Sequence, residues 1–271
     1  MDLNSLFQYE RGTPAYWRET PERVKDGVRA RNVVYTTPAG VRRAAYLLRP
    51  ELATGPLAAV LFVHWYEPEV LSNHRSQFLP DAERLVRQGA VALLVETLWS
   101  DRDFFLKRTQ ADDLANSRQQ VVELRQAMDI LLAQPGVDAG RFAYVGHDFG
   151  GMYGVLTGAV DPRPTCYVIM AATPRFPDWY LYAPKLEGEA RDRFIEQMAP
   201  LDPIANVGRL APAPILFQFG RNDFHVPVER AEAFFAAAEE PKTVRWYDAG
   251  HGLNDQATED RVQWLSEQLG C

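Results

Sequence analysis

An aspartate sits in a glycine-flanked turn of this sequence, and an acid and a histidine follow it along the chain. Asp148 lies midway between Gly146 and Gly150 in the segment GHDFGG, directly after an apolar run. Glycines at these positions let a strand turn abruptly into a helix, so that the central side chain projects outward. Asp223 and then His251 each follow a later apolar run. This order predicts a nucleophile at Asp148 and a base at His251 that Asp223 orients.

The type of nucleophile restricts the chemistry. A serine or thiolate attacks a carbonyl and then transfers an acyl group, whereas a carboxylate that attacked an ester would give an anhydride. Carboxylates are better matched to saturated carbon. Asp148 therefore argues against ordinary acyl transfer.

The surrounding sequence predicts an α/β protein with a mostly parallel central sheet flanked by helices, because apolar runs of strand length alternate with amphipathic stretches of helix length. The runs predicted as strands are 57–63, 90–96, 141–146, 165–171, 214–220 and 243–248. The stretches predicted as helices are 76–88, 112–134, 149–159, 228–239 and 254–269. Since the carboxyl ends of parallel strands meet at one edge of a sheet, Asp148, Asp223 and His251 are expected to share one crevice.

Two segments depart from this alternation. Residues 1–30 are polar and are predicted as an N-terminal arm, followed by one domain over 31–271 that starts with a hairpin at 31–49. Residues 174–212 contain six prolines and a charged stretch, and they are predicted as a short lid inserted between two strands. The aromatic residues of the arm that could dock on the domain are Phe7, Tyr9, Tyr16 and Trp17.

Composition excludes several classes of partner. The chain has 271 residues, is 46% hydrophobic and carries a formal charge of −7, with no run of basic residues to hold a nucleic acid or an anionic membrane. No stretch approaches the roughly 18 apolar residues that span a bilayer, and we expect a cytoplasmic protein. Cys166 and Cys271 offer neither a disulfide framework nor a CxxC metal pair. A small neutral molecule is the expected partner, and homodimer formation is left open.

The three motifs resemble the α/β-hydrolase superfamily, over about residues 31–269. GHDFGG resembles its aspartate-nucleophile branch, which contains epoxide hydrolases and haloalkane dehalogenases. The short lid, the paired strands at the start and the run from LDPIA through GRNDFHVP resemble dienelactone-hydrolase-type members instead, whose nucleophile is usually Cys or Ser. The resemblance implies an α/β-hydrolase fold with a short lid, acting on a small molecule without a metal or organic cofactor.

The resemblance also implies a two-step reaction. Asp148 would attack an epoxide carbon or a carbon bearing a halide, and His251 would then activate a water that hydrolyses the resulting ester. The second step makes an oxyanion, which the superfamily stabilises with backbone N–H groups. Those groups would come from Phe149 and from Trp65 and Tyr66, although Trp65 stands where the family commonly has glycine.

The leaving group distinguishes the two branches of this chemistry. Epoxide hydrolases protonate the departing alkoxide with lid tyrosines, a role open to Tyr180, Tyr182 and also Tyr66. Dehalogenases hold a halide with indole N–H groups, and the residue after the nucleophile is here Phe149, whose side chain cannot donate. We therefore expect an epoxide-like substrate, bound by Tyr66, Trp179, Tyr180 and Tyr182.

Other interpretations of the same residues stay open. Asp148 could act as a general base in the hydrolysis of an ester or lactone, the chain could be a haloalkane dehalogenase, or the crevice could bind a ligand without turnover. His64 and His147 are expected to support the backbone of the two motif loops, and His225 is expected at the loop or rim near Asp223.

Overall fold

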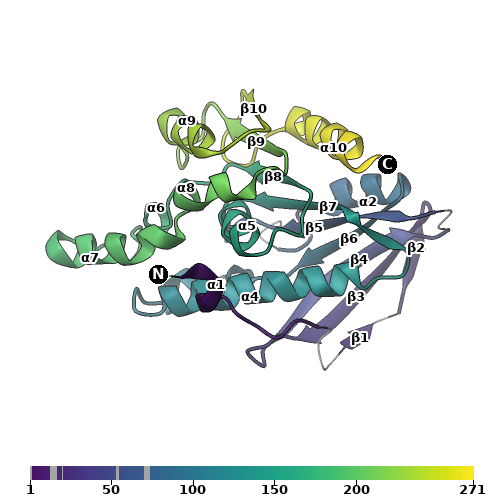
Figure 1. The fold of residues 1–271 in the computed structure, drawn as a ribbon, viewed down its shortest axis with the longest axis horizontal. Helices are drawn as coiled ribbons and strands as arrows, with labels where there is room; N and C mark the ends of the chain where they lie inside the picture. Colours follow the sequence, from purple (N-terminus) through teal and green to yellow (C-terminus); the bar gives the residue numbers. More distant parts are fainter. Residues whose placement is uncertain (1, 13–16, 20, 53–54, 70–73) are drawn as a thin grey trace.

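A twisted sheet with helices on both faces organises the chain (Figure 1). The computed structural model describes residues 2–12, 17–19, 21–52, 55–69 and 74–271. Within them the strand order is β1-β3-β4-β6-β5-β7-β8-β9-β10, and β2 also pairs with β3. The strands are β1 (Trp17–Glu19), β2 (Arg23–Lys25), β3 (Val28–Thr36), β4 (Arg42–Pro50), β5 (Leu57–Val63), β6 (Ala90–Val95), β7 (Val137–His147), β8 (Cys166–Met170), β9 (Ile215–Gly220) and β10 (Lys242–Tyr247).

Pairing is parallel from β6 through β5, β7, β8 and β9 to β10, and antiparallel among β1 to β4 and between β4 and β6. The helices are α1 (Leu3–Leu6), α2 (Leu79–Arg87), α3 (Phe104–Lys107), α4 (Asp113–Leu132), α5 (Phe149–Val160), α6 (Pro177–Tyr180), α7 (Gly188–Met198), α8 (Pro203–Asn206), α9 (Val228–Ala237) and α10 (Asp255–Leu269), with 3-10 turns η1 (Leu98–Ser100), η2 (Ala199–Leu201) and η3 (Val207–Leu210). The six predicted strands and five predicted helices are confirmed, with ends displaced by a few residues.

The central strands are buried on both faces, as expected for parallel strands between two helix layers. Along β5 the side chains alternate: Ala59, Leu61 and Val63 join the core beneath α4 and α5, and the intervening residues join the core beneath α2 and α10. Every residue of β5, β6, β8 and β9 is buried, whereas the antiparallel strand β3 is buried only in part. The two cores fix where the carboxyl ends of the strands lie.

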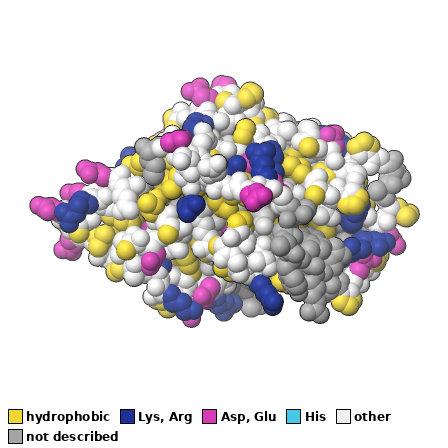
Figure 2. Space-filling model, turned by 60° about the horizontal axis from the view of Figure 1, so that its bottom comes forward, with side chains coloured by type: hydrophobic (Ala, Val, Ile, Leu, Met, Phe, Trp, Pro, Cys, Tyr) yellow, Lys and Arg dark blue, Asp and Glu magenta, His cyan; other side chains and the backbone are white. Residues whose placement is uncertain are grey.

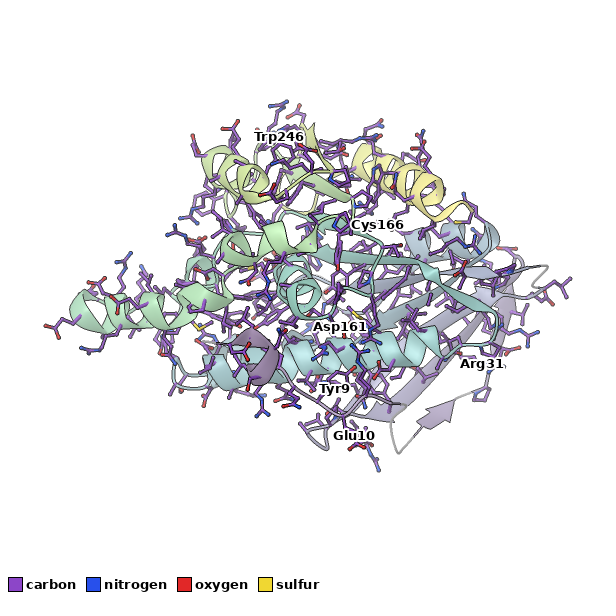
Figure 3. The ribbon with its side chains drawn as sticks, viewed as in Figure 1. Tyr9, Glu10, Arg31, Asp161, Cys166 and Trp246 are labelled. Atoms are coloured by element: carbon purple, nitrogen blue, oxygen red, sulfur yellow. The ribbon has the colours of Figure 1, made fainter. Side chains whose placement is uncertain are left out.

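The segment predicted as an N-terminal arm contributes to the sheet. β1 and β2 both pair with β3, which itself begins at Val28. Before them, Phe7 is fully buried and its carbonyl accepts from Arg125 at 2.7 Å, while the Tyr9 hydroxyl donates to Asp129 at 2.9 Å. Tyr9 thus docks on α4, close to the Asp161 ion pairs (Figure 3). Of the other predicted docking residues, Tyr16 and the side chain of Trp17 lie outside the described residues.

Residues 174–212, hereafter the insertion, connect β8 to β9 through α6, α7, η2, α8 and η3, and α7 projects from the body (Figure 1). Arg108 anchors its first part. The guanidinium is almost completely buried, pairs with Asp113 of α4 at 2.8 Å and donates to the carbonyls of Tyr180 and Ala183. The Arg108 guanidinium therefore ties the insertion to the helix layer next to the turn at Asp148.

The charges on one face and the character of the helices complete the description. On the face shown in Figure 2, acidic and basic side chains are interspersed among apolar side chains and other uncharged surface. None of the described helices is both long and apolar enough to cross a bilayer.

We predict that Arg108→Met lowers the free energy of unfolding by about 2–4 kcal/mol, because it leaves Asp113 buried without its cation and two carbonyls without their donor. Urea unfolding measures the loss, and limited trypsin digestion should cut the insertion faster. Arg191→Met is the matched control for the urea measurement, since within the described residues Arg191 forms an ion pair only with the exposed Asp192 beside it. Equal stability of the two variants would contradict the anchoring role.

Candidate active site

The nucleophile turn is a strained junction between β7 and α5. Asp148 is the single residue between them, with φ 53° and ψ −117°, a conformation that residues with a side chain rarely adopt. The flanking glycines are required by space: a Cβ on Gly146 would lie 2.3 Å from the Gly150 carbonyl oxygen, and one on Gly150 would lie 2.1 Å from that of Val63. The strain fixes the direction of the Asp148 side chain, which is completely buried.

The two carboxylate oxygens of Asp148 have different surroundings. Oδ2 accepts the backbone N–H of Tyr66 at 3.2 Å, and the backbone N–H of Phe149 also bonds to the carboxylate. Oδ1 is buried and has no hydrogen-bond partner among the described residues. It lies 3.9 Å from His251 Nε2. One oxygen is therefore held by backbone dipoles, while the other is free to react.

Burial raises the pKa of Asp148 to about 7. The nearby His251 and the two backbone N–H groups oppose this rise, because each favours the charged form. The carboxyl group thus changes its charge near neutral pH.

His251 follows β10 and is oriented by Asp223, which follows β9. His251 Nδ1 lies 2.8 Å from Asp223 Oδ2, and Asp223 Oδ1 accepts the backbone N–H groups of His225 and Val226. Nδ1 is therefore assigned as the donor, which leaves Nε2 as a base toward Asp148. Burial would lower the pKa of His251, but the hydrogen bond to Asp223 and the charge of Asp148 outweigh it and raise that pKa. Asp148, Asp223 and His251 are thus brought together.

The loop after β5 supplies one of the two backbone donors expected from it. Tyr66 N–H faces Asp148, whereas Trp65 N–H donates to Gln77 Oε1 at 3.0 Å. The prediction that Trp65 donates to the oxyanion is therefore wrong, because a side-chain amide already occupies its N–H. The Trp65 ring instead stacks on His147 at 4.6 Å between centroids and lies 6.0 Å from the His251 ring.

Gln77 is a structural residue that the sequence did not indicate. Besides Trp65 N–H it bonds His147 Nδ1 at 2.6 Å, and His147 Nε2 bonds the carbonyl of His251 at 2.9 Å. One chain of polar contacts therefore joins the loop after β5, the nucleophile turn and the histidine loop. His64 supports the loop after β5 similarly, since its Nδ1 bonds the Trp65 carbonyl. Burial lowers the pKa of His64 to about 3.

Solved structures share this arrangement of elements. The chain superposes on an acetyl xylan esterase from Paenibacillus sp. R4 with a TM-score of 0.77, 16% identity and coverage of 98% of this chain and 99% of that one. A putative dienelactone hydrolase from Klebsiella pneumoniae subsp. pneumoniae MGH 78578 gives 0.65, 20% identity and coverage of 90% and 99%. The chain has the α/β-hydrolase fold. The match to acetyl xylan esterase 1 from Thermoanaerobacterium sp. JW/SL YS485 agrees, with a TM-score of 0.74, 16% identity and 99% coverage of both chains.

Sequence comparisons add nothing to this result, because no family model and no curated protein matches the chain. The structural similarities establish the α/β-hydrolase fold. The described residues also contain no group of three or more His, Cys, Asp or Glu side chains placed to hold a metal ion.

Two of the three tyrosines predicted to bind substrate use their hydroxyls in hydrogen bonds within the protein. The buried Tyr180 hydroxyl pairs with that of Tyr153 at 2.6 Å, and substrate contact by Tyr180 stays a prediction. The Tyr66 hydroxyl bonds the Arg102 carbonyl at 3.2 Å, and Tyr182 is 52% exposed beside Trp179. Tyr66 therefore contributes its backbone N–H, and Tyr182 lies at the rim.

Four buried polar atoms at this site lack hydrogen-bond partners within the described residues. They are Asp148 Oδ1, His251 Nε2, the indole Nε1 of Trp179 and His225 Nδ1. Trp179 belongs to α6, and its ring lies 5.8 Å from that of His251 and 5.9 Å from that of Phe149. A buried polar group without a hydrogen-bond partner costs about 1–3 kcal/mol of stability. Because four such groups belong to one site, this is where a ligand could supply the missing hydrogen bonds.

We predict that Asp148→Asn makes the protein more stable than the wild type at about pH 8, by at most about 4 kcal/mol. The pKa of Asp148 in the folded state lies above its unfolded value of 3.8, so ionisation of Asp148 destabilises the folded wild-type protein. This destabilisation grows between the two pKa values and is complete above about pH 7. The difference should therefore vanish near about pH 4. Urea unfolding across this range measures it, with the exposed Asp192→Asn as control. A difference independent of pH would contradict the assignment.

Proposed function

We propose that the chain is a hydrolase in which Asp148 attacks a saturated electrophilic carbon, most simply that of an epoxide, and forms a covalent alkyl ester. The observation that carries the proposal is the unequal environment of the two carboxylate oxygens. Oδ2 accepts the backbone N–H of Tyr66, the Phe149 N–H also bonds to the carboxylate, and Oδ1 has no hydrogen-bond partner among the described residues. When water attacks the ester, the Asp148 carboxyl group becomes a tetrahedral oxyanion, which backbone N–H groups must stabilise. Those N–H groups already contact the carboxylate before the reaction begins.

The first step forms the bond from Asp148 Oδ1 to carbon and breaks the bond from that carbon to the leaving atom. In the second step His251 Nε2 takes a proton from a water, which attacks the Asp148 carboxyl carbon. The negative charge then collects on Oδ2, where the Tyr66 and Phe149 N–H groups hold it. Collapse releases Oδ1 as the product oxygen, and His251 returns its proton to it.

The same geometry disfavours acyl transfer. An ester carbonyl would need the backbone donors that the Asp148 carboxylate already uses, and a carboxylate attacking it would give an anhydride. Access also favours a small substrate, because Asp148 is completely buried and the His251 side chain is only 10% exposed.

We predict that His251→Gln traps the alkyl-enzyme, because the ester forms but no base activates water. Intact mass after incubation with panels of epoxides and haloalkanes reads the adduct directly. An epoxide adds its whole mass, while a haloalkane adds its mass less that of the hydrogen halide, so the measurement separates the two substrate classes. Peptide mapping should place the adduct on Asp148.

The matched control is the double variant Asp148→Asn, His251→Gln, which should stay unmodified. Modification of the control to the same extent, or no adduct with any compound of either panel, would contradict the proposed nucleophile.

A second candidate is the hydrolysis of a small ester or lactone, with Asp148 as a general base. It is favoured by the names of the similar structures, which are two acetyl xylan esterases and a putative dienelactone hydrolase. Turnover of nitrophenyl esters that is lost in Asp148→Asn, with no adduct on Asp148 in the His251→Gln variant, would select this candidate over the first.

A further inference from the structure

His225 is a polar side chain that neither proposed step uses. It lies on the loop after β9, two residues beyond Asp223, and its backbone N–H donates to Asp223 Oδ1 at 2.8 Å. The other oxygen of that carboxylate holds His251. One acid therefore fixes the positions of both histidines, and the His225 ring lies 5.2 Å from the His251 ring in an edge-to-face arrangement.

His225 and Trp179 form a pair of unsatisfied groups next to the base. Their ring centroids lie 4.9 Å apart, and His225 Nδ1 and Trp179 Nε1 are both buried and unpaired in the described part of the chain. They come from different elements, the loop after β9 and helix α6, so local chain geometry does not explain their meeting. An indole N–H can only donate, whereas an imidazole can also transfer its proton. The pair fits a leaving atom that accepts one hydrogen bond and receives one proton.

We propose that His225 is the acid that protonates the departing oxygen of the substrate, with the Trp179 indole N–H donating to the same atom. This inference rests on the proposed function and narrows its substrate to a strained cyclic ether. The tyrosines are less well placed for this role, since the hydroxyls of Tyr180 and Tyr66 are bonded to Tyr153 and to the Arg102 carbonyl. The third, Tyr182, is half-exposed at the rim.

The protons balance over one turnover. As Asp148 Oδ1 bonds to the ether carbon, the bond between that carbon and the ether oxygen breaks and its electron pair moves to the oxygen. The oxygen then takes the Nδ1 proton of the His225 imidazolium. Hydrolysis then adds one water to the Asp148 carboxyl carbon, and His251 passes one water proton to the released Oδ1. The second water proton leaves the re-formed Asp148 carboxyl group and restores the His225 imidazolium, so the net reaction is ether plus water to diol.

The charges around His225 set its acidity. Burial and the adjacent His251 lower the pKa of His225, whereas the carboxylates of Asp223 and Glu67 oppose that change. The remaining faces carry the uncharged rings of Trp179, Tyr182 and Phe224. The imidazolium is consequently a strong proton donor that is most populated on the acid side of neutrality, while Asp148 is ionised on the alkaline side.

The experiment compares two aryl substrates that differ in their leaving atom, styrene oxide and 2-bromoethylbenzene. Adduct formation on Asp148 is timed by intact mass in the His251→Gln background, so only the first step is observed. His225→Phe should slow the reaction of styrene oxide by about 100-fold, which is typical of a lost general acid, and that of the bromide by less than about fivefold. The reaction of styrene oxide should also pass through a maximum with pH, which His225→Phe removes.

Asn222→Ala is the control for disturbance of the loop, because Asn222 lies on the same loop, is exposed, and bonds the exposed Asp248 through its side chain. It should leave both rates within about twofold, and thermal unfolding should show that each variant is folded. Equal slowing of the two substrates by His225→Phe, no slowing of either, or adducts from the bromide alone would overturn the role of His225. Failure of the His251→Gln parent to form any adduct would instead overturn the proposed function.

Discussion

The site depends on a buried carboxylate whose position is imposed by a strained backbone. Asp148 has a positive φ at the junction of β7 and α5, and Gly146 and Gly150 leave no room for any larger residue. The turn carries the side chain to backbone N–H groups on one side and to His251 on the other. Because solvent does not reach the carboxyl group, its pKa rises to about 7, and its reactivity becomes sensitive to every neighbouring charge.

The remaining polar contacts maintain that geometry. Gln77 and His147 link the loops after β5 and β10 to the turn at Asp148, and so fix the positions of these three segments relative to one another. Arg108 holds the insertion over the same region from the helix layer. The insertion in turn brings the Trp179 indole beside His251, and its N–H has no hydrogen-bond partner in the described part of the chain. In the proposed reaction this N–H donates to the leaving atom.

Much of this could be predicted from the sequence. Continuous apolar runs located the parallel strands because both of their faces are buried, and the glycine spacing located Asp148 because only glycine fits there. Roles that depend on hydrogen-bond direction could not be predicted. Trp65 N–H is taken by Gln77, which lies in no motif, and the Tyr180 hydroxyl is taken by Tyr153, a helix residue with the spacing of an ordinary core position. The sheet strands before residue 28 were missed because they are only three residues long.

The central claim is that an oxygen atom of Asp148 leaves with the product. Turnover of an epoxide by the wild-type protein in water enriched in oxygen-18 tests it directly, with mass spectrometry of both the diol and the peptide that contains Asp148. We predict that the first turnover yields an unlabelled diol and that the label enters the Asp148 carboxylate, since water attacks the ester carbon. A labelled diol in the first turnover, with no label in that peptide, would mean that water attacks the substrate itself and would contradict the account.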